Sequence, residues 1–164
     1  MQDYGELVEG TALPVHDLMA FLADVGLVEA PTVALADTRV AYHDACHALR
    51  AQGIKRQPRD VLRQIPGTQI VELANGDRCC GAAGLYNVLE PEMSGALMRQ
   101  KAEAVGDAGV RVVASANPGC TMQIAAGLRE LNLDVEVVHP VELLDRAYRA
   151  SSEGESPPAG TVAP

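Results

Sequence analysis

The four cysteines are the residues of this chain whose type and spacing could do chemistry: a single Cys46, the adjacent pair Cys79 and Cys80, and Cys120. Cysteine thiolates bind iron–sulfur clusters and zinc, and neighbouring cysteines exchange between thiol and disulfide. Zinc sites favour cysteine pairs roughly two to four residues apart, and no such pair occurs here. An iron–sulfur cluster is therefore the first hypothesis, with a thiol–disulfide centre at Cys79–Cys80 and a structural zinc site as alternatives.

Four apolar runs rich in β-branched residues predict strands, and a helical pattern follows each of them. The runs cover residues 38–42, 68–73, 110–114 and 135–138. Helices are expected near residues 58–64, 92–105, 120–131 and 140–149, and one more at 14–23 precedes the first strand. This alternation predicts an α/β fold, with about four parallel strands flanked by helices in Rossmann-like or flavodoxin-like layers.

Each cysteine group follows a predicted strand. Cys46 follows the first strand, the pair Cys79–Cys80 the second, and Cys120 the third. Because the carboxyl ends of parallel strands meet at one edge of a sheet, we expect the four thiols to converge there. The glycines beside the cysteines, Gly81 and Gly119, would let a cluster approach the backbone closely. Cys120 is expected at the start of a helix, where backbone N–H groups and the helix dipole favour a thiolate.

Other polar residues near the cysteine loops are expected to matter less. His43 and His47 flank Cys46 and could complete a zinc site, but we expect them to hydrogen-bond to the site or to be solvated. The nearby carboxylates and a small basic patch are expected to lie exposed at the surface: Asp44, Asp77, Lys55, Arg56 and Arg59.

The composition argues against a nucleic-acid partner and against a membrane-spanning chain. The net charge is −9 and the pI about 4.8, so phosphate backbones would repel this protein. No apolar run approaches the roughly 20 residues that span a bilayer. Residues 1–10 are too polar for a signal peptide. We therefore expect a cytoplasmic chain, whose thiols stay reduced.

The chain of 164 residues, 48% of them hydrophobic, has the size of one domain with a proper core. We expect three parts. Residues 1–30 form an N-terminal helical lead-in, the remnant of a larger protein. Residues 31–150 form the cysteine-rich α/β domain. Residues 151–164, rich in Ser, Gly and Pro, form a disordered tail.

The cysteines stand in three motifs: His43-x-x-Cys46-His47, Cys79-Cys80-Gly81-x-x-Gly84 and Ala116-Asn117-Pro118-Gly119-Cys120. From about residue 38 to 148 the chain resembles the cysteine-rich "CCG" domain, above all the C-terminal copy in the iron–sulfur subunit of glycolate oxidase. Lactate-utilisation iron–sulfur proteins and heterodisulfide reductase subunits are similar. The resemblance implies that Cys46, Cys79, Cys80 and Cys120 are the cluster ligands. Gln123 stands where heterodisulfide reductase-type domains have a further cysteine, which favours a 4Fe–4S cluster held by four thiolates.

The resemblance also implies a function without substrate chemistry of its own. The chain would relay electrons from an FAD-containing glycolate oxidase subunit to a membrane-associated acceptor, in the cytoplasm and at the inner face of the membrane. Full-length members carry an upstream ferredoxin-like part and a first cysteine-rich half. We expect both to be missing here, because Asp3-Tyr4-Gly5 resembles the stretch that follows that first half.

Overall fold

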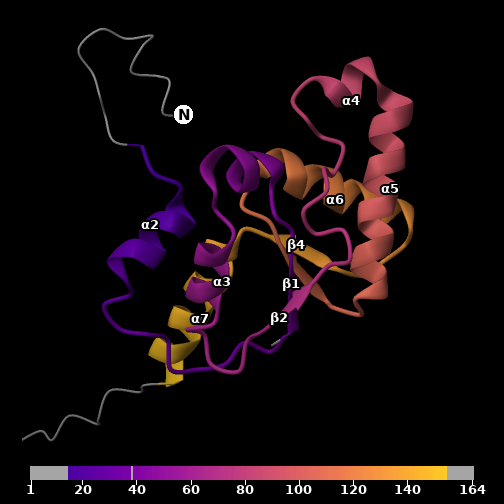
Figure 1. Ribbon diagram of the computed structural model, residues 1–164. Coiled ribbons are helices and arrows are strands. Elements are labelled where there is room, and N and C mark those ends of the chain that lie inside the picture. The colour runs from indigo at the N-terminus through magenta and orange to yellow at the C-terminus, as the bar shows by residue number, and fades with distance from the viewer. Residues whose placement is uncertain (1–14, 38, 155–164) are drawn as a thin grey trace, which may run out of the picture.

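A parallel sheet of four strands forms the centre of the protein (Figure 1). The computed structural model describes residues 15–37 and 39–154. The strands are β1 (Arg39–Tyr42), β2 (Gln69–Glu72), β3 (Val112–Ala114) and β4 (Glu136–Val138). Their order in the sheet is β2-β1-β3-β4, and every pairing is parallel. The predicted α/β class, with about four parallel strands, is confirmed.

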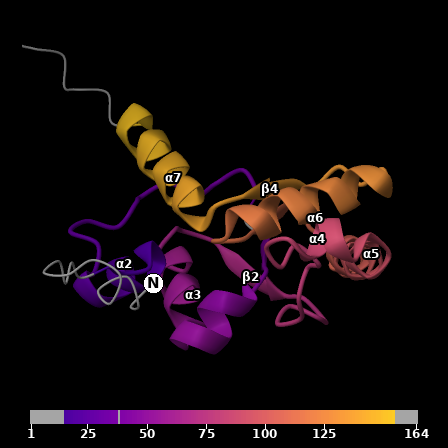
Figure 2. The same cartoon turned by 90° about the horizontal axis from the view of Figure 1, so that it is seen from above.

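Helices cover both faces of this sheet (Figure 2). One face carries α2 (Leu18–Val25), α3 (Arg56–Leu62) and α7 (Pro140–Gly154). The other carries α5 (Pro91–Asp107) and α6 (Pro118–Glu130). Two short segments complete the chain: η1 (His47–Ala51), a π-helical turn after β1, and α4 (Tyr86–Leu89), which precedes α5.

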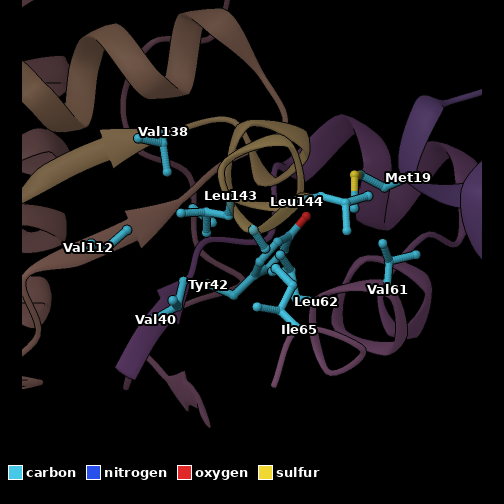
Figure 3. Close-up of a cluster of buried hydrophobic side chains, with 12 residues drawn as sticks. Met19, Val40, Tyr42, Val61, Leu62, Ile65, Val112, Val138, Leu143 and Leu144 are labelled. Carbon is cyan, nitrogen blue, oxygen red and sulfur yellow. The ribbon is translucent and has the colours of Figure 1, made fainter. Parts of the chain in front are cut away.

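Strand side chains alternate between the two faces and build two cores. Val40 and Tyr42 of β1 join the core under α2, α3 and α7, where Met19 and Leu144 lie beside them (Figure 3). Ala41 points to the other core, which also holds Cys80 and Cys120. The side of the sheet under α5 and α6 is therefore the side that positions the buried cysteines.

Gly127 lets α6, the helix that carries Cys120, pack closely on α5. A Cβ atom at this position would lie 2.9 Å from Met98 Cγ and 3.0 Å from Ala102 Cβ, both on α5. Larger residues would push the two helices apart. The small residue thus helps to fix Cys120 relative to the opposite wall of the site.

Several element boundaries differ from the sequence expectations. α3 begins at Arg56 rather than at residue 58, and η1 was expected to be a loop. α7 continues to Gly154, four residues beyond 150, because Ser151 Oγ accepts hydrogen bonds from the N–H groups of Thr32 and Val33. Residues 151–154 are therefore helical rather than part of a tail. Met19 of α2 is fully buried in the domain's own core.

Parts of three sequence predictions lie outside the described residues. They are residues 1–14 of the lead-in, which include the Asp3-Tyr4-Gly5 stretch, Thr38 of the first strand, and residues 155–164 of the tail. Among the described helices, none combines the length and the apolar character that crossing a bilayer requires.

Candidate metal centre

The four cysteines meet at the carboxyl edge of the sheet, as predicted. The chain leaves β1 toward α3 on one face and leaves β3 toward α6 on the other, so a crevice opens between these strand ends. Cys46, Cys79, Cys80 and Cys120 all line one cavity of about 340 Å³ at this place. None of the four takes part in a disulfide.

Small residues make up much of the remaining wall. The cavity is also lined by Ala45, His47, Ala82, Ala83, Gly84, Asn117 and Gly119. Gly119 thus lies where the sequence analysis expected it, at the wall of the site. Gly81 does not line the cavity. It lies next to the cysteine pair and packs against Ser94 of α5.

The loop that carries the cysteine pair is held against α5 and α6. Gly81 has a φ of +95°, and a Cβ atom there would lie 2.5 Å from the backbone oxygen of Ser94. Ser94 Oγ donates to the Gly81 carbonyl at 2.9 Å, and Gln123 Nε2 donates to Ser94 Oγ at 3.0 Å. Gln123 therefore fixes the loop through Ser94.

The thiols form an inner and an outer pair. Cys80 and Cys120 are buried, with 1% and 6% of their surfaces exposed. A hydrogen bond from the Cys120 side chain lowers the pKa of Cys80, and the neighbouring His43 ring and the Ala82 N–H act in the same direction. Cys46 and Cys79 are half-buried and interact with each other. Burial raises the pKa of Cys79, although the Gly81 N–H donates to its sulfur at 3.3 Å.

Cys120 lies in the first turn of a helix, as expected. Its N–H is capped by Asn117 Oδ1 at 3.1 Å, within the first turn of α6. The hydrogen bond to Cys80 raises the pKa of Cys120, and burial raises it further.

Asp44 and Arg59 were expected at the surface, and both expectations were wrong. Their side chains are only 4% and 6% exposed, and the guanidinium binds the carboxylate through two hydrogen bonds of 2.7 and 2.9 Å. Arg59 also binds Glu72 at the end of β2 and covers the Tyr42 ring at 4.6 Å. This network anchors the loop that leads to Cys46. Asp77, by contrast, is exposed, as expected.

Two buried basic residues lie near the cysteines: His43, which was expected to hydrogen-bond to the site or to be solvated, and Lys101, which the sequence analysis missed. His43 is fully buried, and one of its ring nitrogens lies within 4.8 Å of the Cys80 and Cys120 sulfurs. Lys101 of α5 is 1% exposed and donates to the Asn75 carbonyl. Burial lowers the pKa of Lys101, while the charges of Cys80, Asp77, Cys120 and Cys79 oppose that shift. His47, the other histidine beside Cys46, is exposed.

Signals for both residues were present in the sequence. His43 is two positions from Ala41 and so continues the strand alternation toward the core that contains Cys80. Its N–H indeed donates to the Ala114 carbonyl at 2.9 Å, which extends the pairing of β1 with β3. Lys101 lies between Met98 and Ala102 on the apolar stripe of α5.

An apolar surface adjoins the cysteine cavity. A second groove of about 550 Å³ shares Ala82, Gly84 and Gly119 with it and is also lined by Asn87 of α4 and Met122 of α6. Met122 is 73% exposed. The largest exposed apolar side chains of this region also include Leu85, Val88, Leu89 and Met93.

Comparisons with known proteins agree with this arrangement. Residues 40–125 match the family model described as "CCG: Cysteine-rich domain". A subunit of the fumarate reductase (CoM/CoB) of Methanothermobacter marburgensis is 39% identical over 140 residues, which are 85% of this chain and 28% of that protein.

Two bacterial proteins are also similar. The probable glycolate oxidase iron-sulfur subunit of Bacillus subtilis is 36% identical over 64% of this chain and 24% of that protein. Lactate utilization protein A of Oceanobacillus iheyensis is 34% identical over 65% of this chain and 44% of that protein. The chain thus spans less than half the length of these relatives. With the family model matched across all four cysteines, this chain belongs to the CCG cysteine-rich domain family.

Proposed function

We propose that this chain is an iron–sulfur electron-transfer module, in which Cys46, Cys79, Cys80 and Cys120 hold a 4Fe–4S cluster. The observation that carries the proposal is the convergence of four free cysteines on one cavity. Four thiolates are the usual ligand set of such a cluster. When bound, the cluster supplies one-electron redox chemistry.

The cavity has room for a group of several atoms. Its volume of about 340 Å³ is roughly ten times the ~30 Å³ that a water molecule occupies in the liquid. A wall of Ala and Gly residues allows close approach to the backbone, and Gly119 is part of it. N–H groups of Gly81 and Ala82 already point at the Cys79 and Cys80 sulfurs. Such donors stabilise negative charge on thiolate ligands.

The same geometry disfavours a thiol–disulfide enzyme. Exchange requires a thiolate that a substrate sulfur can reach. The cysteine with the lowered pKa is Cys80, and only 1% of its surface is exposed. The more accessible member of the pair, Cys79, has a raised pKa. The thiol with the lowered pKa and the more accessible thiol are therefore two different residues. A metal site can work with this arrangement, whereas a thiol–disulfide enzyme needs both properties in one cysteine.

The names of the relatives guide the finer proposal. One of them is a probable glycolate oxidase iron-sulfur subunit. By analogy, this chain would accept electrons from an FAD-containing subunit that oxidises a 2-hydroxy acid, and pass them to a membrane-associated acceptor at the cytoplasmic face. The exposed apolar residues beside the cavity support contact with a partner subunit. The chemistry on the substrate would belong to the flavin.

The test is the metal content of protein purified without oxygen. We expect iron and acid-labile sulfide at about four each per chain, with broad absorption near 400 nm. A Cys79→Ser/Cys80→Ser variant should lose both, while the control His16→Asn, an exposed residue outside the cysteine cavity, should keep them. Zinc in place of iron, or folded protein that takes up no iron and sulfide on reconstitution, would refute the cluster. Reduction of the loaded protein by the FAD subunit and a 2-hydroxy acid tests the relay.

A further inference from the structure

His43 is a buried polar side chain whose ring has the Cys80 sulfur as its polar neighbour and no partner at ordinary hydrogen-bond geometry. It is 0% exposed, and within the part of the chain that the structure describes neither Nδ1 nor Nε2 finds a donor or acceptor by normal hydrogen-bond geometry. Nearly all buried polar groups in proteins are paired, so such a group calls for an explanation. The backbone of His43 is fixed by its pairing with Ala114. The ring is therefore held in place beside the Cys80 sulfur.

The ring faces the inner pair of cysteines. One of its nitrogens and the sulfurs of Cys80 and Cys120 all lie within 4.8 Å of one another, and all three residues are buried. Tetrahedral coordination at about 2.0–2.3 Å would place such donors about 3.3–3.8 Å apart. Side-chain movements of less than about 1 Å each would close that difference. Cys46 and Cys79 do not belong to this compact group.

We propose that His43, Cys80 and Cys120 form an inner subsite that binds a single thiophilic divalent ion, such as zinc, cobalt or ferrous iron, without Cys46 or Cys79. Imidazole and thiolate are the donors that these ions prefer. Two thiolates would neutralise the dication, so the bound ion would add no net charge to a buried place. Water would take the fourth position. This goes beyond the cluster, because it needs neither sulfide nor all four cysteines.

Cobalt binding to the metal-free, reduced full chain tests which cysteines are needed. Without sulfide, we expect one Co²⁺ per chain with tetrahedral d–d bands and thiolate-to-cobalt absorption. Cys46→Ser and Cys79→Ser should change the dissociation constant by no more than about threefold, whereas Cys80→Ser or Cys120→Ser should raise it by more than about tenfold. An equal loss of affinity in Cys46→Ser and Cys120→Ser would overturn the inner subsite.

A matched pair of histidine variants tests the nitrogen ligand. His43→Gln should weaken cobalt binding more than about tenfold, and His16→Gln, an exposed histidine outside the cysteine cavity, by no more than about threefold. Because His43→Gln could also disturb the core, unaltered protein provides a second measurement. Among the four histidines, zinc should shift one ring ¹⁵N resonance strongly, that of His43. Stoichiometric zinc with an unchanged His43 resonance would overturn the proposal.

The two proposals fail separately. Cys46→Ser should abolish assembly of the iron–sulfur cluster and yet still bind Co²⁺. Wild-type protein that loads iron and sulfide but shows no His43-dependent cobalt site would overturn the subsite and leave the cluster standing. Protein that binds Co²⁺ through His43 but never assembles a cluster would overturn the cluster and leave the subsite standing.

Discussion

Replacing Arg59 with methionine should destabilise the whole domain, because this side chain joins three segments that support the cysteine edge. From α3 it binds Asp44 after β1 and Glu72 at the end of β2, and it covers the ring of Tyr42. Asp44 in turn donates its N–H to the Gly76 carbonyl at 3.1 Å, in the loop before the cysteine pair. Arg59→Met keeps an unbranched apolar stem and removes the guanidinium with its charge.

The size of the effect follows from burial. The Asp44 side chain is 4% exposed, and removing one partner of a buried ion pair costs about 3–5 kcal/mol because the other charge stays buried. The Glu72 side chain is 58% exposed, so its pairing adds at most about 1 kcal/mol. We therefore expect the free energy of unfolding to fall by about 4 kcal/mol. That corresponds to a melting temperature lower by about 10 °C or somewhat more.

Urea unfolding of the metal-free protein measures this loss. Arg56→Met is the matched control, since Arg56 lies on the same helix, is 87% exposed and, among the residues that the structure describes, forms an ion pair with Asp60 alone. It should change stability by less than about 0.5 kcal/mol. The double variant Asp44→Asn/Arg59→Met should regain at least half of the loss, because the unpaired carboxylate is gone. A cost below about 1 kcal/mol for Arg59→Met would refute the reasoning.

The same network predicts a dependence on pH. Hydrogen bonds from Arg59 hold the pKa of Glu72 below its ordinary value of 4.5. A carboxyl group with a lowered folded pKa adds stability that is complete above the unfolded pKa and is lost as the pH falls through the folded pKa. Because Glu72 is largely exposed, solvent screening limits this part to about 1 kcal/mol. Urea midpoints at about pH 6 and about pH 3 should differ less in Glu72→Gln than in wild type; an equal difference contradicts the assignment.

Two further variants probe the walls of the site. Gly81→Ala should cost about 1–3 kcal/mol from its positive φ alone, and more from the Cβ that would lie 2.5 Å from the Ser94 oxygen; Gly84→Ala, with a φ of +63° and open space around it, should cost only the first part. Urea unfolding of both compares them, and equal costs would exclude the contact with Ser94. Lys101→Met should lower the reduction potential of the iron-loaded protein, by about 59 mV if the reduced form becomes tenfold less favoured, whereas the exposed Lys55→Met should not. Spectroelectrochemistry measures the reduction potential of both variants. A Lys101→Met potential equal to that of the wild type would mean that the buried ammonium does not act on the cluster.

The fold and the convergence of the cysteines could be predicted because both follow from local patterns. β-Branched runs followed by helical periodicity leave few arrangements other than a parallel sheet. The shared edge then brings Cys46, Cys79, Cys80 and Cys120 together from distant parts of the sequence. The exact helix ends could not be predicted, since they depend on tertiary contacts. Ser151, which accepts hydrogen bonds from the backbone around Thr32, extends α7 in this way.

Residues that act across layers were the ones misjudged. Asp44 and Arg59 each look like surface residues in their own segment, and only the packing of α3 against β1 and β2 buries them together. The hydrogen bond between Cys80 and Cys120 likewise joins two segments that are distant in sequence. A charged residue is rarely buried without a partner. Sequence alone offers no way to name that partner when it lies on another element.

His43 and Lys101 share a physical problem that the cysteines can solve. In the described part of the chain, the His43 ring has no partner at ordinary hydrogen-bond geometry and the Lys101 ammonium forms no ion pair with a carboxylate. Buried groups of this kind are costly unless ligand atoms or opposite charge compensate them. A metal centre held by the cysteines would supply both: the metal ion would be an electrophile for the imidazole, and the thiolates would be a lasting negative charge for the ammonium. The cost of burying these two side chains is therefore best explained by the metal chemistry of the cysteines in front of them.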